Sequence, residues 1–172
     1  MKKVDNDILK KDLEKLKVGE EIYFSGIVYT ARDRAHKKLV ELIKKNKRLP
    51  FDINGSIIYY CGATINPKDK IIGSCGPTTS RRMDSFVEPL LKRGLLAMIG
   101  KGSRSDKVKN LIKKYKALYL IAPSGCGALL AKKVISKEIV AFEEFGTEAI
   151  YKLIVKDFPL VIGIDARGRS IY

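Results

Sequence analysis

Side chains able to bind an anion gather in three short stretches of the sequence. The first, residues 29–36, reads YTARDRAH; the second, residues 73–84, reads GSCGPTTSRRMD; and the third, residues 100–105, reads GKGSRS. Arginine binds carboxylate and phosphate through two parallel N–H groups, and glycine lets backbone N–H groups approach an anion closely. The three stretches therefore predict an anion-binding site that accepts a carboxylate as readily as a phosphate.

Each stretch also has an interpretation that needs no ligand. One of the hydroxyls of residues 78–80 could cap the next helix, and Ser105 could cap the helix that follows the third stretch. Lys101 offers a point charge, but its loop lacks the GxxxxGK[ST] spacing of a phosphate loop. His36 is the single histidine, without HxH or HExxH spacing, and is more typical of a packed or surface residue than of a catalyst.

The cysteines form no recognisable metal or disulfide pattern. Cys61, Cys75 and Cys126 are odd in number and widely spaced, and no CxxC occurs. This excludes a disulfide framework and a zinc ribbon. Free cysteines are usually small buried hydrophobic residues, so an iron–sulfur cluster held by these three thiolates is the weaker interpretation.

The composition is that of a folded, water-soluble domain with a strongly basic surface. The 172 residues include 45% hydrophobic and 31% charged residues, with a net charge of +15. Such a chain buries a sizeable core, which excludes intrinsic disorder, and its length suits one domain. No stretch approaches a membrane span and no signal peptide is evident, so we expect a cytoplasmic protein that does not associate with membranes.

The positive charge has three possible causes: a polyanion partner, a small anionic substrate, or a solvated lysine surface. Residues 34–48 and 92–116 are the most basic segments, and the second contains nine Lys and Arg and one acidic residue. A nucleic-acid-binding module is therefore the alternative from another function class. No RRM, KH or helix-turn-helix pattern accompanies the charge, so we expect no nucleic-acid partner.

Strand and helix patterns alternate along the chain and would carry the three stretches at strand ends. Residues 5–17 have helical spacing, and we predict an N-terminal helical arm over 1–18 and a domain over 19–172. The predicted strands are 21–30, 57–62, 95–100, 117–122, 138–142 and 159–165, and the predicted helices are 31–48, 85–94, 108–116, 127–134 and 147–155. The alternation favours an α/β domain with a partly parallel sheet, whose ligands lie beyond the carboxyl ends of the strands.

Five sequence segments carry a specific resemblance to a known family. They are GIVYTARDRAHKK (26–38), GSCGPTTSRRMD (73–84), IGKGSRS (99–105), AFEEFGTEA (141–149) and VKDFPLVIGIDARG (155–168). In this order they resemble the β subunit, or carboxy-terminal domain, of class I iron–sulfur fumarases and of the closely similar L-tartrate dehydratases. The resemblance covers about residues 19–172.

The resemblance implies a fold, a partner and a reaction. The fold would be a swivelling β/β/α domain in three layers. The partner would be an α subunit that carries a four-iron four-sulfur cluster, in a heterotetramer or around a β-subunit dimer, and the chain alone would be inactive. The reaction would be the reversible hydration of fumarate to (S)-malate, with L(+)-tartrate dehydration as the alternative.

The resemblance also implies roles for individual residues. Arg32, Arg82 and Lys101 would contact the carboxylates of a small dicarboxylate substrate. Thr78 is the first candidate for proton transfer and Lys101 the second, and no residue of this chain would bind metal. The expected supporting residues are Asp33 and Asp84, which would orient the arginines, and Arg104 and Ser105, which would shape the lysine loop.

Overall fold

Seven strands form one sheet in the order β1-β2-β3-β4-β5-β7-β6. The computed structural model describes residues 1–64 and 70–172. The strands are β1 (Lys2–Asp5), β2 (Glu21–Thr30), β3 (Ile57–Tyr59), β4 (Ala97–Gly100), β5 (Leu118–Ile121), β6 (Val134–Ala141) and β7 (Ile150–Ile164). The helices are α1 (Asn6–Asp12), α2 (Asp33–Lys44), α3 (Val87–Lys92), α4 (Asp106–Tyr115) and α5 (Gly127–Ala131), with 3-10 turns η1 (Leu13–Lys15), η2 (Ser80–Phe86) and η3 (Glu143–Glu148).

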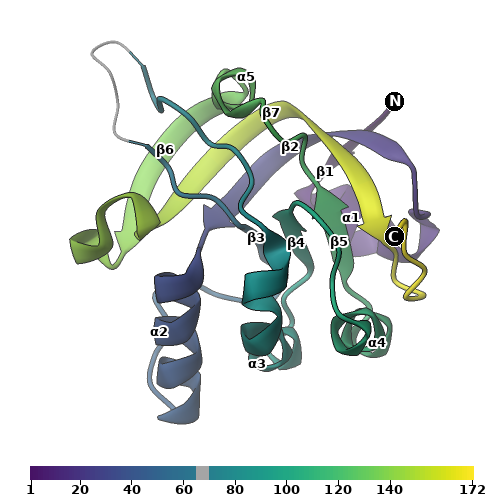
Figure 1. Ribbon diagram of the computed structural model, residues 1–172, viewed down its shortest axis with the longest axis horizontal. Helices are drawn as coiled ribbons and strands as arrows, with labels where there is room; N and C mark the ends of the chain where they lie inside the picture. The colour runs from purple at the N-terminus through teal and green to yellow at the C-terminus, as the bar shows by residue number, and fades with distance from the viewer. Residues whose placement is uncertain (65–69) are drawn as a thin grey trace.

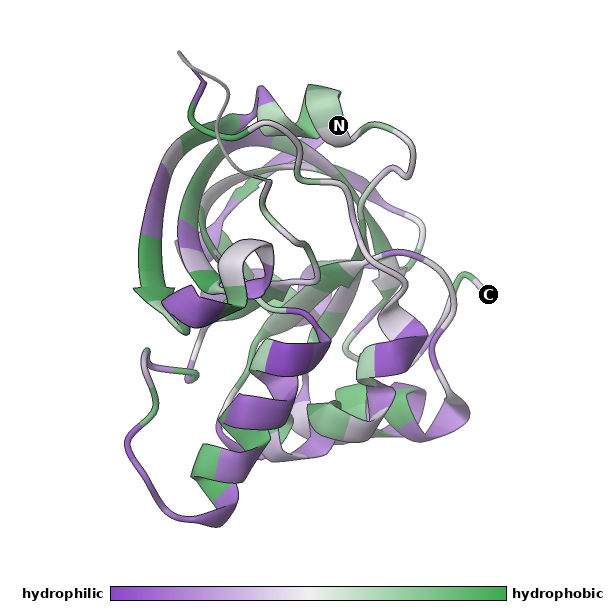
Figure 2. Ribbon diagram, turned by 60° about the vertical axis from the view of Figure 1, so that its left-hand side comes forward, coloured by the Kyte–Doolittle hydropathy of each residue, from purple (hydrophilic) through white to green (hydrophobic). Residues whose placement is uncertain are grey.

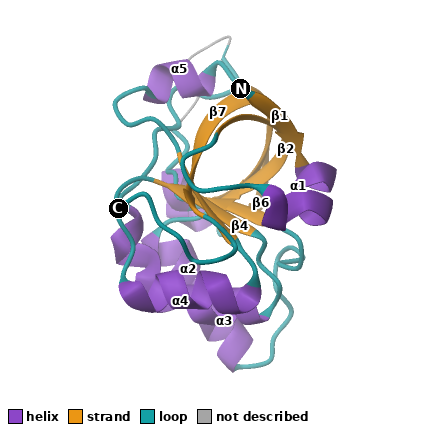
Figure 3. Cartoon of the chain, turned by 90° about the vertical axis from the view of Figure 1, so that its right-hand side faces the viewer, coloured by secondary structure: helices purple, strands orange, loops and turns teal. Residues whose placement is uncertain are grey.

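The long strand β7 closes part of this sheet into a barrel. Strands β1 to β5 pair in parallel, each with the next, while β7 is antiparallel to β2, β5 and β6. Because β7 pairs with both β2 and β5, the strands β2, β3, β4, β5 and β7 form a closed ring. Figure 3 looks into this barrel, with helices α2, α3 and α4 on one side of it. The predicted α/β class and partly parallel sheet are confirmed, whereas the barrel closure was not predicted.

The barrel closure escaped prediction because the first half of β7 has the spacing of a helix. The predicted helix over 147–155 is wrong. Its first two residues end the 3-10 turn η3, and from Ile150 onward the segment belongs to strand β7. Its apolar residues recur three and four positions apart, but they are mostly β-branched or aromatic, which suits a strand. Pairing with β2 on one side, for example Val28 with Leu153, and with β6 on the other decides the outcome.

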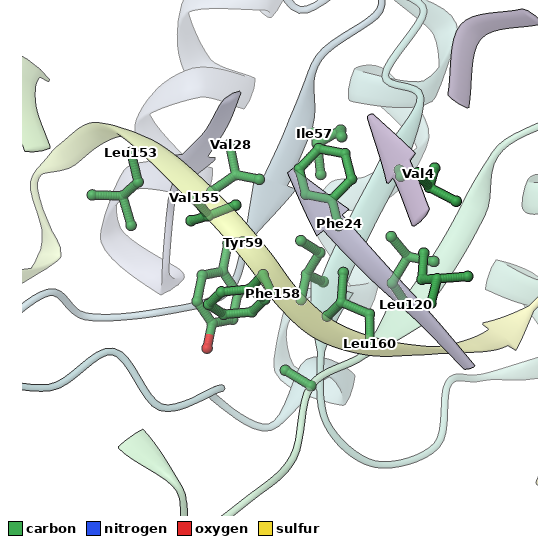
Figure 4. Packing of buried hydrophobic residues seen from close by; sticks show 14 of the residues in the cluster. Val4, Phe24, Val28, Ile57, Tyr59, Leu120, Leu153, Val155, Phe158 and Leu160 are labelled. Carbon is green, nitrogen blue, oxygen red and sulfur yellow. The ribbon is translucent and has the colours of Figure 1, made fainter. Parts of the chain in front are cut away.

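Two hydrophobic clusters hold the strands and helices together. One fills the barrel, where Tyr59 and Phe158 meet edge to face with ring centroids 5.6 Å apart (Figure 4). The other lies between the sheet and helices α2, α3 and α4, which stand side by side below the barrel in Figure 1. Figure 2 shows hydrophilic residues along the outer surfaces of these helices. The loops before α2 and α4 are thereby fixed at the ends of the strands.

The first 18 residues pack against the barrel. The predicted helix is present as α1, where the Asp5 side chain caps the helix by accepting the Ile8 N–H at 2.8 Å. The preceding strand β1 pairs in parallel with β2 and was not predicted. Leu9, Leu13 and Leu16 are buried in the same cluster as the barrel strands. Within the described ranges, none of the helices has the length and apolar character that a bilayer crossing requires.

Candidate functional site

The three predicted stretches meet at the carboxyl ends of neighbouring parallel strands. Thr78 donates its N–H to the Tyr60 carbonyl at the end of β3, at 2.6 Å. Thr79 forms a parallel bridge with Lys101, which follows β4, and the Ser80 N–H donates to the Lys101 carbonyl at 3.0 Å. The Ala31 N–H, at the end of β2, donates to the Tyr59 carbonyl at 3.0 Å. The sheet thus brings residues far apart in sequence to one edge, as the α/β pattern predicts.

Arg32 and Arg82 are linked through a shared carboxylate. Asp33 Oδ2 accepts from Arg82 Nη2 at 3.2 Å and lies 4.0 Å from Arg32 Nε. Glu148 Oε1 lies 3.8 Å from the same Arg32 nitrogen. The Arg82 and Arg32 side chains remain 51% and 32% exposed, so both can still reach a ligand. The structure therefore joins Arg32, Asp33 and Arg82 and adds Glu148, whose only signal in the sequence was the segment AFEEFGTEA.

One nitrogen of the Arg32 side chain makes no hydrogen bond to the described residues. Its Nε is buried, and no hydrogen-bond partner for it is found in the described part of the chain. The guanidinium lies against the backbone of Gly62, where an added Cβ would come within 3.2 Å of Arg32 Nη1. The Asp33 and Glu148 carboxylates lie 4.0 and 3.8 Å from Arg32 Nε, beyond hydrogen-bond distance but close enough to balance its charge. The exposed part of the guanidinium is the part that a ligand carboxylate can reach.

Thr78 and Lys101 lie on two loops that run beside each other. Both residues are half-buried, whereas Thr79, which follows Thr78, is exposed. The bridge between Thr79 and Lys101 fixes the two backbones in register. Residues that carry a hydroxyl and an ammonium thus lie on adjacent loops.

Asp84 and Arg104 form a buried ion pair beneath these loops. Arg104 Nε donates to Asp84 Oδ1 at 2.7 Å, and the Ser105 N–H donates to Asp84 Oδ2 at 2.8 Å. The guanidinium carbon lies 5.3 Å from the Tyr60 ring centroid and 4.9 Å from that of Tyr119. Burial disfavours the charge of Arg104, but the neighbouring Tyr60 and Asp84 outweigh it and raise the pKa. Asp84 therefore contacts Arg104, while Asp33 contacts Arg82.

Ser105 begins the helix that follows the lysine loop. Its Oγ accepts the Val108 N–H at 3.3 Å, so it is the N-cap of α4 as one interpretation of the sequence predicted. Its backbone N–H is bound to Asp84. The end of the lysine loop is thus held from both the helix and the ion pair.

Gly100 allows the hydroxyl loop to approach β4. A Cβ at this position would lie 1.9 Å from Ser80 Oγ and 2.9 Å from Tyr60 Cδ2, both on buried residues. We expect Gly100→Ala to lower the free energy of unfolding by about 1–3 kcal/mol, because forcing a methyl group into a packed site displaces its neighbours. Urea denaturation measures this. Gly76→Ala is the control, since neither Gly76 nor Gly100 has a left-handed φ and a Cβ at Gly76 would make only an ordinary contact, 3.5 Å from Gly127 Cα; we expect its midpoint to stay close to that of the original protein. An unchanged midpoint for Gly100→Ala would refute the close approach.

His36 is a buried support for the first turn of α2. Its Nδ1 lies 2.8 Å from the Arg32 carbonyl oxygen, which places the proton on Nδ1, and it packs edge to face on Tyr60. Its Nε2 is buried, with no hydrogen-bond partner among the residues described. Burial lowers the pKa of His36 to about 4, so the ring is neutral at pH 7. The packed interpretation of His36 is confirmed.

The buried His36 makes stability depend on pH. Its folded pKa lies below the unfolded value, so the unfolded state binds more protons between pH 4 and 6.5, and stability falls as pH drops through that window. We expect the free energy of unfolding to be about 2 kcal/mol smaller at pH 5 than at pH 7.5. Urea denaturation of the protein and of His36→Asn at both pH values isolates this contribution. An equal pH dependence in the two would contradict the buried neutral ring.

The cysteines are not arranged as a cluster site. Cys61 and Cys75 are buried, and Cys126 stands half-buried at the start of α5. A hydrogen bond with Cys75, together with burial, raises the pKa of the Cys61 thiol. In residues 1–64 and 70–172, no group of three or more His, Cys, Asp or Glu side chains could hold a metal ion. The geometry fits a hydrogen-bonded pair of thiols in the core.

The amino-acid sequence matches the model of a known family. The chain fits the family model described as "Fumarase C-terminus" over residues 1–172. A Methanocaldococcus jannaschii protein, provisionally named an L(+)-tartrate dehydratase subunit beta, is 43% identical over 97% of this chain and 89% of its own length. The L(+)-tartrate dehydratase subunit beta of Escherichia coli K12 is 36% identical, over 99% of this chain and 87% of that protein.

Longer relatives contain this chain as one part. The anaerobic class I fumarate hydratase of Escherichia coli K12 is 40% identical over 93% of the chain, which spans 30% of that protein. Fumarate hydratase 2 of Leishmania major is 37% identical, and the chain again spans 30% of it. These matches agree with the resemblance carried by the five segments. The chain belongs to the fumarase C-terminus family, whose relatives are L(+)-tartrate dehydratase β subunits and class I fumarate hydratases.

Proposed function

We propose that this chain is the β subunit of a two-subunit class I fumarate hydratase, which interconverts fumarate and (S)-malate. The observation that carries the proposal is the meeting of Arg32, Arg82 and Lys101 with Thr78 at one edge of the sheet. A dicarboxylate substrate needs two separate cationic contacts to fix its orientation. The β-subunit names of relatives of similar length support a second subunit.

In this proposal the arginines and the lysine bind the substrate and stabilise charge. Arg32 and Arg82 use the exposed parts of their guanidinium groups to hold carboxylates, while Asp33 keeps the two side chains together. When a proton leaves C3 of malate, negative charge develops on the adjacent carboxylate, and Lys101 lies on the loop that can stabilise it. Glu148 adds a second carboxylate near Arg32, 3.8 Å from its Nε.

Thr78 is the proposed proton-transfer residue. A threonine hydroxyl is a weak base unless a neighbour takes its proton, so the role requires a carboxylate that we assign to the α subunit. Lys101 is the second candidate, because its loop is bridged to the loop of Thr78. The position of Thr78 on a loop bound to Tyr60 and beside Lys101 supports a defined geometry for this step.

The proposal assigns the remaining parts to the partner and to the fold. A four-iron four-sulfur cluster, bound by the α subunit, would act as a Lewis acid toward the substrate. The three cysteines of this chain do not fit that cluster, because Cys61 and Cys75 are buried in the core. We assign the chain to a swivelling three-layer β/β/α domain in a cytoplasmic heteromer; the barrel with its layer of helices supports the layered α/β fold alone.

L(+)-tartrate dehydration is the second candidate function. The substrate carries one more hydroxyl and the same two carboxylates, so the cationic contacts suit both. Within Escherichia coli K12 the class I fumarate hydratase is 40% identical and the tartrate dehydratase β subunit 36%. The Methanocaldococcus jannaschii relative, provisionally named a tartrate dehydratase β subunit, is 43% identical. Sequence identity therefore does not separate the two substrates.

Anaerobic reconstitution with the cluster-bearing α subunit tests the proposed function. We expect the mixture to hydrate fumarate and each subunit alone to be inactive. The kcat/KM for fumarate should exceed that for L-tartrate measured in parallel. A higher kcat/KM for L-tartrate would move the assignment to tartrate dehydratase, and no turnover of either by an intact complex would refute both.

A further inference from the structure

One buried tyrosine touches both of the loops on which the proposed chemistry depends. Tyr119 lies on β5 and is fully buried. Its hydroxyl is hydrogen-bonded to Ser80 Oγ at 2.9 Å and to the Gly102 carbonyl oxygen at 2.8 Å. Ser80 follows Thr78 by two residues, and Gly102 follows Lys101 directly. A single hydroxyl thus connects the loop of Thr78 to the loop of Lys101.

The surroundings leave Tyr119 little freedom to move. Its ring lies under the Arg104 guanidinium, whose carbon is 4.9 Å from the ring centroid, and Arg104 is itself held by Asp84. On another side, an added Cβ at Gly163 would lie 3.1 Å from Tyr119 Cδ1. Burial raises the pKa of Tyr119, so its hydroxyl keeps its proton in the neutral range. The hydroxyl is therefore a fixed, neutral anchor.

Other contacts also join the two loops. The backbone joins them through the Thr79–Lys101 bridge and the Ser80 N–H to Lys101 carbonyl bond. Farther along both loops, Asp84 accepts from Arg104 Nε and from the Ser105 N–H. Between these contacts lies the Gly102 turn, with φ of +80°, whose carbonyl oxygen accepts from Tyr119. The Tyr119 hydroxyl thus adds a side-chain contact at Ser80 and Gly102, the contact nearest in sequence to Thr78 and Lys101 that involves a side chain outside the two loops.

We propose that Tyr119 is a positioning residue, whose hydroxyl sets the distance between Thr78 and Lys101. This inference rests on the proposed function, because it concerns the same site. It assigns Tyr119 no contact with the substrate. Its effect is on turnover, which requires Thr78 and Lys101 to act on one substrate at once, and much less on the carboxylate binding by Arg32 and Arg82.

Tyr119→Phe tests the proposal in the complex reconstituted with the α subunit. The variant keeps the ring and its packing but removes the hydroxyl. We expect kcat to fall by about 10- to 100-fold, because a displacement of about 1 Å in a reacting group costs that much. KM should change by less than about threefold, since uniform substrate binding is retained.

Tyr60→Phe is the matched control. Tyr60 is equally buried in the same cluster, and its hydroxyl, in the described ranges, contacts Arg104 Nη2 at 3.4 Å without bridging the loops. We expect its kcat to stay within about threefold of the original enzyme. Ser80→Ala removes the other partner of the Tyr119–Ser80 hydrogen bond. Because the Tyr119–Ser80 hydrogen bond is lost in either variant, the effects of Tyr119→Phe and Ser80→Ala on kcat should not multiply in the double variant.

The outcomes separate this inference from the function on which it rests. An original complex that turns over neither dicarboxylate refutes the proposed function. An active original complex with unchanged kcat in Tyr119→Phe refutes the positioning role alone. Equal losses in Tyr119→Phe and Tyr60→Phe also overturn it, since they would reflect general core damage. If Tyr119→Phe does not fold, Ser80→Ala decides: normal kcat in that variant overturns the proposal.

Discussion

We expect Lys101→Ala to lower the turnover of the reconstituted enzyme by about 100- to 1000-fold, as removal of one charge-stabilising donor does in other enzymes. The Lys101 backbone is bound to Thr79 and Ser80, so the loop itself should stay in place when the side chain is shortened. The loss comes from the ammonium, which would face the developing negative charge. Steady-state kinetics of fumarate hydration measures it.

Two controls make the Lys101 result specific. Association with the α subunit, followed by size-exclusion chromatography, should be unchanged, because the effect is on charge in the site. Lys113→Ala removes an ammonium from the exposed side of α4, and we expect kinetics within about threefold of the original enzyme. A Lys101→Ala complex with near-original kcat and KM would show that Lys101 takes no part in the reaction.

The largest expected effect on stability comes from Asp84→Ala. Arg104 has no exposed side-chain surface and Asp84 is 13% exposed, so the variant leaves a buried guanidinium without its carboxylate. It also removes the acceptor of the Ser105 N–H. Breaking a buried ion pair in this way costs about 3–5 kcal/mol. Urea denaturation at pH 7.5 should show this loss in the free energy of unfolding.

Asp106→Ala is the comparison for Asp84→Ala. Asp106 also pairs with a basic residue, Lys109, at 3.6 Å, but its side chain is 95% exposed. A surface pair of this kind contributes about 0–1 kcal/mol. If Asp84→Ala were no more destabilising than Asp106→Ala, the buried pair would not hold the loops as described.

Strands with strong local patterns could be predicted from the sequence. Residues 21–30 form β2 with the predicted bounds. They are rich in β-branched and aromatic residues, with Gly19 shortly before them and a helical pattern after them. The strand β1 was missed since Lys2–Asp5 has too few apolar residues, and pairing with β2 stabilises it. The closure by β7 depends on contacts between distant segments, which local periodicity does not contain.

In the candidate site, too, the positions of the loops could be predicted from the sequence, whereas the contacts between their side chains could not. The sequence located the loops of Arg32, Arg82, Thr78 and Lys101, because strand-end loops in α/β proteins are where ligands bind. It did not indicate that Asp84 would bind Arg104 rather than one of the arginines expected to contact substrate. Asp84 and Arg104 are 20 positions apart in the sequence, and only the fold brings them together. The role of Tyr119 could not be predicted either, because nothing in the predicted strand 117–122 distinguishes a bridging hydroxyl from a packed ring.

A titration of this chain into a fixed amount of the cluster-bearing α subunit tests the central claim most directly. Under anaerobic conditions we expect fumarate hydration to rise from zero with added chain and to saturate at a defined subunit ratio. The Lys101→Ala chain should saturate at the same ratio with a far lower plateau. Activity of the α subunit that does not change as this chain is added would contradict the claim that the chain completes the active site.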